Sequence, residues 1–121
     1  MPQIAIEYSA NLTGAFDARA LAQEVHRLIA ATVDTDLGNC KTRLVQLDDC
    51  LIGDGAPEQA MVHVDLRILS GRTDAQKTAL GEAVLGAAIA AIGDHKLQIQ
   101  VTVEVRELDR ANYHKKVLRS G

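Results

Sequence analysis

The sequence predicts an α+β fold: a two-layer sandwich in which two β-α-β units share one four-stranded sheet, with two helices on one face. The hydrophobic pattern changes from strand-like alternation to helical spacing and back again, and it does so twice along the chain. Both helical stretches are long enough for the crossover that parallel strands require. The length of 121 residues suits one core, so we expect a single domain over residues 1–121.

The first unit is predicted from three stretches of sequence. Alternating apolar residues over 4–8 indicate a strand with one buried face. Apolar residues then recur at helical spacing over 21–29, and residues 35–39 end that helix. A second, less regular strand is expected over 41–48. Residues 48–59 contain two glycines and a proline and predict a long surface connection.

The second unit repeats this order with clearer signals. Every second residue over 61–69 is Val, Leu or Ile, and the residues between them are His63, Asp65 and Arg67 with Met61 and Leu69 at the two ends, which indicates a strand. Thr73 and Gln76 have the spacing of a helix capping box, and the helix that they begin is expected to stop near Gly93. The last strand, over 98–106, has the most regular alternation in the chain.

Two features favour contact with a further molecule. Ala5, Met61 and Leu69 lie on strand faces opposite the main apolar sets, and the second helix is rich in Ala and Gly. Both features favour a homo-oligomer. The tail over residues 109–121 carries four basic residues and one acidic residue. We expect this tail to be either a loose end or an arm that lies on a neighbouring subunit.

The composition argues against several classes of protein. A net charge of −3 with 47% apolar and 24% charged residues is typical of soluble globular domains, and no bulk nucleic-acid-binding surface is expected. Charges interrupt the apolar stretches and no secretory signal opens the chain, so no membrane association is expected. Cys40 and Cys50 are too few for a disulfide framework, which favours a cytoplasmic location. With 2% aromatic residues, the core must be aliphatic.

The common catalytic and metal-binding motifs do not occur in the sequence. No Gly-rich dinucleotide or phosphate loop is present, and Ser70-Gly71 lacks the flanking residues of a nucleophile elbow. His63 and Asp65 share a strand face, but two candidate ligands without a third do not make a metal site. We therefore expect no metal and no cofactor.

Pro2 is the first candidate for chemistry. It follows the initiator Met1 at the start of a strand, a position where proline is also tolerated for structural reasons alone. If Met1 is removed, Pro2 exposes a secondary amine held rigidly at the edge of a sheet. Such an amine titrates at about 7.7–8.0 in peptides, and apolar surroundings or a nearby arginine lower that pKa. A neutral amine can act as a general base and return the proton as its conjugate acid.

A base of this kind needs a cation that binds an anionic substrate and stabilises the charge that develops on its oxygen. Arg72 follows a strand and precedes a helix N-terminus, where backbone N–H groups also favour anions. Lys41 and Arg43 open the second strand, and they lie beside the first strand if those two strands pair. Each of these three residues could instead be an ordinary solvated charge on the surface, without a role in binding.

Several blocks of the sequence resemble one enzyme family in order and spacing. The most specific are residues 1–12 (MPQIAIEYSANL) and residues 62–73 (VHVDLRILSGRT), followed by shorter blocks at Glu104–Leu108 and Tyr113–Lys115. In these blocks the chain resembles the 5-carboxymethyl-2-hydroxymuconate Δ-isomerases of the tautomerase superfamily. The resemblance covers almost the whole chain, and the helices between the blocks are generic.

The resemblance implies a tautomerase-like subunit in a homotrimer, with Met1 removed and the Pro2 amine as acid and base. The implied reaction moves a proton from the enol oxygen of a hydroxymuconate to a distant carbon, in the degradation of homoprotocatechuate. Arg72 matches the family's substrate-binding arginine after the third strand. At the family's second arginine position this sequence has Lys41, with Arg43 two residues on, and lysine lacks the planar fork that binds a carboxylate bidentately.

The leading hypothesis is therefore a cofactor-free isomerase whose partner is a small carboxylated enol. Two alternatives stay open: a tautomerase of different specificity, acting on phenylpyruvate-like enols, and a non-catalytic ferredoxin-like module that binds a small ligand. A retained Met1 would turn the amine of Pro2 into an amide without basicity. The state of the N-terminus therefore distinguishes the enzyme hypotheses from the binding module.

Overall fold

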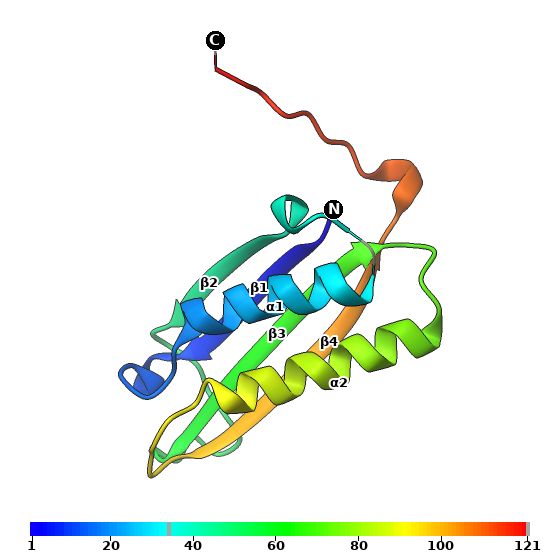
Figure 1. Cartoon of the computed structure of the whole chain (residues 1–121). Coiled ribbons are helices and arrows are strands. Elements are labelled where there is room, and N and C mark those ends of the chain that lie inside the picture. Colours follow the sequence, from blue (N-terminus) through cyan, green and yellow to red (C-terminus); the bar gives the residue numbers. More distant parts are fainter. Residues whose placement is uncertain (34, 121) are drawn as a thin grey trace.

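The protein consists of one sheet and one layer of helices (Figure 1). The computed structural model describes residues 1–33 and 35–120, so Gly121 of the predicted tail lies outside the described residues. The strands and helices follow one another as β1 (Gln3–Ser9), α1 (Ala18–Thr32), β2 (Lys41–Leu47), β3 (Gln59–Leu69), α2 (Asp74–Ala90) and β4 (Gln98–Leu108). Single turns of 3-10 helix form η1 (Ala10–Leu12), η2 (Leu37–Asn39) and η3 (Arg110–Asn112). The predicted α+β class and the two β-α-β units are confirmed, and the observed bounds differ from the predicted ones by only a few residues.

The four strands are ordered β2-β1-β3-β4. Within each unit the two strands are parallel, whereas β1 and β3 pair antiparallel in the middle of the sheet. Gln3 at the start of β1 therefore lies between Lys41 of β2 and Arg67 near the end of β3. The starts of β1 and β2 and the ends of β3 and β4 thus share one end of the sheet, which we call the N-terminal end (Figure 1).

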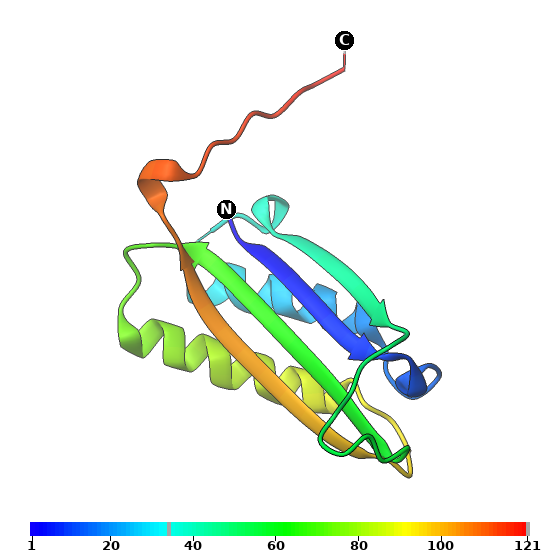
Figure 2. The same ribbon diagram turned by 180° about the vertical axis from the view of Figure 1, so that it is seen from behind.

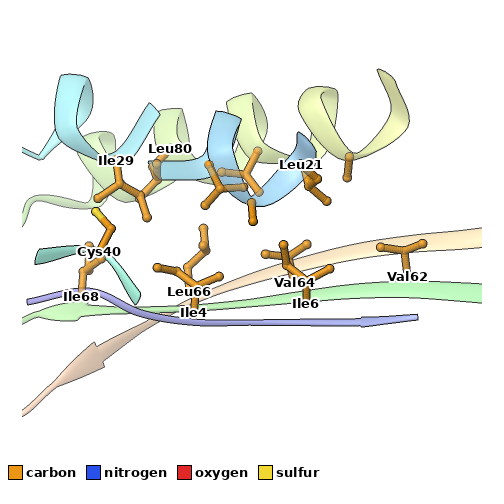
Figure 3. Packing of buried hydrophobic residues seen from close by; sticks show 14 of the residues in the cluster. Ile4, Ile6, Leu21, Ile29, Cys40, Val62, Val64, Leu66, Ile68 and Leu80 are labelled. Carbon is orange, nitrogen blue, oxygen red and sulfur yellow. The ribbon is translucent and has the colours of Figure 1, made fainter. Parts of the chain in front are cut away.

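The core lies between the sheet and the two helices, which cover the same face (Figures 1 and 2). Alternate residues of β1 and β3 point toward the helices, and Leu21, Ile29 and Leu80 point back toward the sheet (Figure 3). The fully buried large side chains are Ile, Leu and Val. Tyr8 and Phe16 pack edge to face at the margin, with ring centroids 5.2 Å apart. The predicted aliphatic core is confirmed.

The helix ends follow local side-chain chemistry. The side chain of Asp17 accepts a hydrogen bond from the backbone N–H of Ala20, 3.0 Å away, and begins α1. Thr73 and Gln76 form both hydrogen bonds of the predicted capping box and begin α2. The small residues of α2 permit close packing, since a Cβ added at Gly81 would lie 3.4 Å from a methyl group of Val105 on β4.

No helix or strand of the described residues covers the other face of the sheet, which we call the open face (Figure 2). The strand register places Ala5, Met61 and Leu69 there, as predicted. Three charged side chains in the middle of this face pair with one another: Asp65 accepts hydrogen bonds from Arg106 at 2.9 and 3.0 Å and from Arg67 at 3.1 Å. The open face is therefore polar, and part of its charge is internally paired.

Candidate active site

Pro2 lies at the N-terminal end of the sheet, immediately before β1. Its side chain is buried, and its carbonyl oxygen accepts a hydrogen bond of 3.3 Å from the backbone N–H of Lys41. The sequence suggested an amine at a sheet edge, but β1 is an inner strand with a neighbour on each side. The start of β1, next to Pro2, is therefore flanked by β2 on one side and β3 on the other. This fixes the direction in which the chain terminus points.

The N-terminal amine lies in an electropositive environment. With Met1 present the amine is that of Met1, and its pKa is held below the ordinary value, first by burial and then by the positive charges of Lys41, Lys115 and Arg72. The Cys40 thiol acts in the opposite direction. The structure thus brings two predicted site residues, Lys41 and Arg72, to the chain terminus, and it adds a third cation that the sequence analysis did not single out.

These three cations have no carboxylate partner within residues 1–33 and 35–120. Among the residues that the structure describes, no salt bridge involves Lys41, Arg72 or Lys115. The ammonium of Lys41 instead donates to the backbone oxygen of Asn39 at 2.9 Å, and that of Lys115 donates to the side-chain oxygen of Asn39 at 2.9 Å. Uncompensated cations around an amine form a binding site for an anion.

Arg72 is positioned by the turn between β3 and α2. Gly71 before it has φ of +110°, a left-handed conformation that favours glycine and lets the chain turn sharply. The Nε atom of Arg72 is buried, and no hydrogen-bond acceptor lies within reach of it in residues 1–33 and 35–120. A buried guanidinium nitrogen without an acceptor is costly unless a ligand supplies one. This donor is consistent with an anionic ligand at the N-terminal end.

The structure separates Lys41 from Arg43. Lys41 pairs with Gln3 next to the chain terminus, whereas Arg43 lies opposite Ala5, farther along the open face. Arg43 lines a cavity of about 260 Å³ whose other residues are Gln3, Ile4, Ala5, Asp65, Arg67 and Leu108. Of the two cations on β2, Lys41 is therefore the one that neighbours the amine.

Two further residues near the terminus escaped the sequence analysis. Cys40 is buried, and burial raises the pKa of its thiol against the opposing effects of the amine and Lys41. Tyr113, beyond β4, accepts a hydrogen bond of 2.8 Å from the side-chain amide of Gln3. The only sequence signal for Tyr113 was its place in a family-like block, and Cys40 had none beyond its position before β2.

The residues considered as metal ligands have other partners. A ring nitrogen of His63 lies 2.7 Å from the hydroxyl of Thr102, and Asp65 is paired with two arginines. Within the described ranges, no group of three or more His, Cys, Asp or Glu side chains could hold a metal ion. Over the same residues, no helix has the length and apolar character needed to cross a membrane.

Comparison with known proteins identifies the family and the fold. The family model described as 5-carboxymethyl-2-hydroxymuconate isomerase matches residues 2–120. A solved 5-carboxymethyl-2-hydroxymuconate isomerase from Deinococcus radiodurans R1 superposes with a TM-score of 0.79 at 25% identity, covering 95% of this chain and 88% of that one. A 5-carboxymethyl-2-hydroxymuconate delta-isomerase gives a TM-score of 0.83 at 19% identity, covering 97% and 88%. No curated protein sequence matches the chain.

A more distant structural neighbour is a fused 4-OT protein described as a symmetric trimer. It superposes with a TM-score of 0.73 at 21% identity and covers 92% of this chain and 89% of its own. At that identity the likeness concerns the fold, and it agrees with the four-stranded sheet and two helices described above.

Proposed function

Since this chain belongs to the 5-carboxymethyl-2-hydroxymuconate isomerase family, within the tautomerase superfamily, and is an isomerase, we propose that it acts on 5-carboxymethyl-2-hydroxymuconate or a closely related enolisable polycarboxylate. The proposed general acid and base is the amine of Pro2 after removal of Met1. The observation that carries the proposal is the cluster of cations around the chain terminus, which have no carboxylate partner in the part of the chain that the structure describes.

The proposed reaction is a proton transfer in two steps. The neutral amine takes the proton of the enol hydroxyl, the oxygen forms a carbonyl, and the conjugated double bonds shift toward the far carbon. The resulting ammonium then returns the proton to that carbon, which yields the conjugated keto isomer. Atoms and charge balance without any other reactant, so the reaction as written needs no cofactor.

The surrounding cations serve two purposes in this mechanism. They hold the substrate carboxylates, and Arg72 supplies a donor for the negative charge that develops on the oxygen during the first step. Burial and these cations lower the pKa of the amine at the chain terminus, which is that of Met1 when Met1 is present, and the same surroundings would favour the neutral form of the Pro2 amine. Lys41 takes the second cationic role in this proposal, with Arg43 as the alternative on the same strand.

The proposal extends to assembly, location and pathway. We propose one domain over residues 1–121, assembled as a homotrimer, and the fused 4-OT trimer with a similar fold supports this assembly. The two free cysteines support a cytoplasmic location. Such an enzyme would act in the degradation of aromatic acids such as homoprotocatechuate. Light scattering coupled to size exclusion would measure the subunit number, and a monomer would contradict the trimer.

The central test compares two forms of the N-terminus. Untagged protein whose mass shows loss of Met1 is assayed spectrophotometrically with 5-carboxymethyl-2-hydroxymuconate, beside protein that retains Met1. We expect activity in the processed form and a fall of about 10²–10⁴-fold in the retained form, because an amide nitrogen has no basicity. Equal activity in both forms would disprove the amine mechanism. No activity in either form would disprove this substrate.

A second candidate function concerns specificity within the same chemistry. Lys41 is a point charge where the family has an arginine, so the site has one bidentate carboxylate partner fewer. This observation favours testing a monocarboxylate enol such as phenylpyruvate in the same assay. A higher kcat/KM for phenylpyruvate would favour the alternative specificity. The non-catalytic module loses its support because the family is one of isomerases.

A further inference from the structure

The segment after β4 contacts three other segments at the N-terminal end of the sheet: the turn after β3, the start of β1 and η2. At its start, the guanidinium of Arg110 donates to the carbonyl oxygen of Ser70 at 2.8 and 3.2 Å, in the turn that carries Arg72. Further on, the hydroxyl of Tyr113 accepts a hydrogen bond from Gln3 on β1. The ammonium of Lys115 then reaches the side chain of Asn39 in η2, next to β2. We call residues 109–115 the C-terminal strap.

The strap lies at the end of the sheet at which the chain begins. In both ribbon views the chain leaves β4, turns through η3 at the N-terminal end and then runs away from the sheet and the helices (Figures 1 and 2). The contact with η2 is made by the long side chain of Lys115. The nitrogen of Lys115 also lies 3.0 Å from the sulfur of Met1. Met1 is the residue whose removal exposes the Pro2 amine, so Lys115 reaches into the volume directly in front of that amine.

Lys115 is equipped to hold an anion in that volume. Its side chain is exposed, and no salt bridge of the described residues involves it. An ammonium group can donate three hydrogen bonds, and that of Lys115 donates one of them to the side-chain oxygen of Asn39. Two donors therefore remain for a ligand that takes the place of Met1.

We propose that Lys115 is a third substrate-binding cation of the active site and that the C-terminal strap positions it. The substrate class of this inference rests on the proposed function. Lys41, Arg72 and Lys115 come from three separate segments and all act on the terminal amine, and three cations suit a substrate with three carboxylates. Lys115 would then bind the third carboxylate of 5-carboxymethyl-2-hydroxymuconate, which 2-hydroxymuconate, with two carboxylates, does not have.

The test uses the full chain with Met1 removed and a neighbouring lysine as the matched control. Lys115→Gln removes the charge, Lys115→Arg keeps it, and Lys116→Gln removes the next charge of the same exposed tail. We expect Lys115→Gln to raise the KM for 5-carboxymethyl-2-hydroxymuconate about tenfold, with a smaller change in kcat. The KM for 2-hydroxymuconate should change less, and Lys115→Arg should recover most of the loss. A wild-type KM in Lys115→Gln would overturn the inference.

A second readout needs no turnover and so separates this inference from the proposed function. The rate at which an acylating reagent modifies the N-terminal amine is measured against pH, since only the neutral amine reacts. The groups that face the amine are Lys41, Cys40, Lys115 and Arg72, and loss of one cation raises the amine pKa. The reaction curve of Lys115→Gln should shift to higher pH, while that of Lys116→Gln stays at the wild-type position. Identical curves for the two variants would overturn the inference even if the enzyme acts on another substrate.

Discussion

The two ends of the sheet are built alike but carry opposite charges. Because β1 and β3 are antiparallel, each end brings the start of one unit next to the end of the other: Gln3 faces Arg67 at the N-terminal end, and Tyr8 faces Val62 at the opposite end. The N-terminal end holds the three cations described above. The opposite end holds the connection between β2 and β3, whose acidic residues are Asp48, Asp49, Asp54 and Glu58.

The opposite end also has a cavity, and its polar side chains have partners within the protein. The cavity has a volume of about 230 Å³ and is lined in part by Ser9, Asn11 and Asp48. The hydroxyl of Ser9 donates to the side chain of Asn11 at 2.7 Å, and the amide of Asn11 donates to the carbonyl oxygen of Gln59 at 2.8 Å. The backbone arrangement alone therefore does not make an anion site. The two ends differ because the cations at the N-terminal end have no carboxylate partner among the described residues, whereas Ser9 and Asn11 at the opposite end are hydrogen-bonded within the protein.

The largest effect among single substitutions is expected at Arg72. Arg72→Ala should lower kcat/KM about 100-fold, because it removes a buried donor that has no acceptor within the described chain. The melting temperature should change by less than about 3 °C, since the side chain makes no salt bridge in the described residues. Steady-state kinetics and thermal unfolding followed by circular dichroism measure the two quantities. Arg119→Ala in the exposed tail is the matched control, and unchanged kinetics in Arg72→Ala would remove this residue from the mechanism.

The sequence could predict the fold because each element carries its own periodic signal. Alternation identified the buried faces of β1 and β3, and the spacing of Thr73 and Gln76 identified the start of α2. The sheet order could not be obtained this way, since it depends on which strands pair. For that reason the sequence suggested a Pro2 amine at a sheet edge, whereas β1 has a neighbouring strand on each side.

The site was predictable only in part, for a related physical reason. Lys41 lies in a strand, and Pro2 and Arg72 lie next to regular elements, whose placement follows from the pattern. Lys115 lies in a segment without periodicity, and its position depends on single long-range hydrogen bonds such as that between Gln3 and Tyr113, which are 110 residues apart. No local pattern indicates such a contact.

The next largest effect is expected on KM, and it should differ between the two cations of β2. Lys41→Ala should raise the KM for a polycarboxylate substrate about tenfold, because Lys41 neighbours the amine, whereas Arg43→Ala should change it by less than about threefold. The same kinetic assay measures both variants. Lys41→Arg keeps the charge and should retain most of the affinity. The reverse order of effects would assign the second cationic role to Arg43.

A smaller effect concerns the paired charges of the open face. Arg106, through its hydrogen bonds, and Arg67 hold the pKa of the Asp65 carboxyl below its ordinary value of 3.8. Its contribution to stability is therefore present above that value and is lost as the pH falls through the lower, folded-state pKa. Asp65→Asn should reduce the free energy of unfolding by about 0.5–1 kcal/mol at pH 7, as expected for a surface pair.

Urea unfolding at pH 7 and pH 3 measures this difference for Asp65→Asn and for a control. The difference from wild type should shrink at the lower pH. Glu104→Gln is the matched control, because Glu104 lies on the same face and its nearest arginine nitrogen is 3.9 Å away. A loss for Asp65→Asn that is equal at both pH values would contradict the electrostatic explanation.

The smallest effect on activity is expected at the opposite end of the sheet. Substitutions there test whether the charge of that end influences substrate binding at the N-terminal end. Asp48→Ala and Asp48→Lys should change kcat/KM by less than about twofold, because Asp48 lies at the far end of β2 from Lys41 and the charge there is screened by salt. The isomerase assay at low and at physiological ionic strength checks this. A marked fall in KM for Asp48→Lys at both ionic strengths would show that the field of the whole molecule governs substrate binding. An unchanged KM assigns binding to the contacts at the N-terminal end, where the cations already lie without carboxylate partners in the described chain.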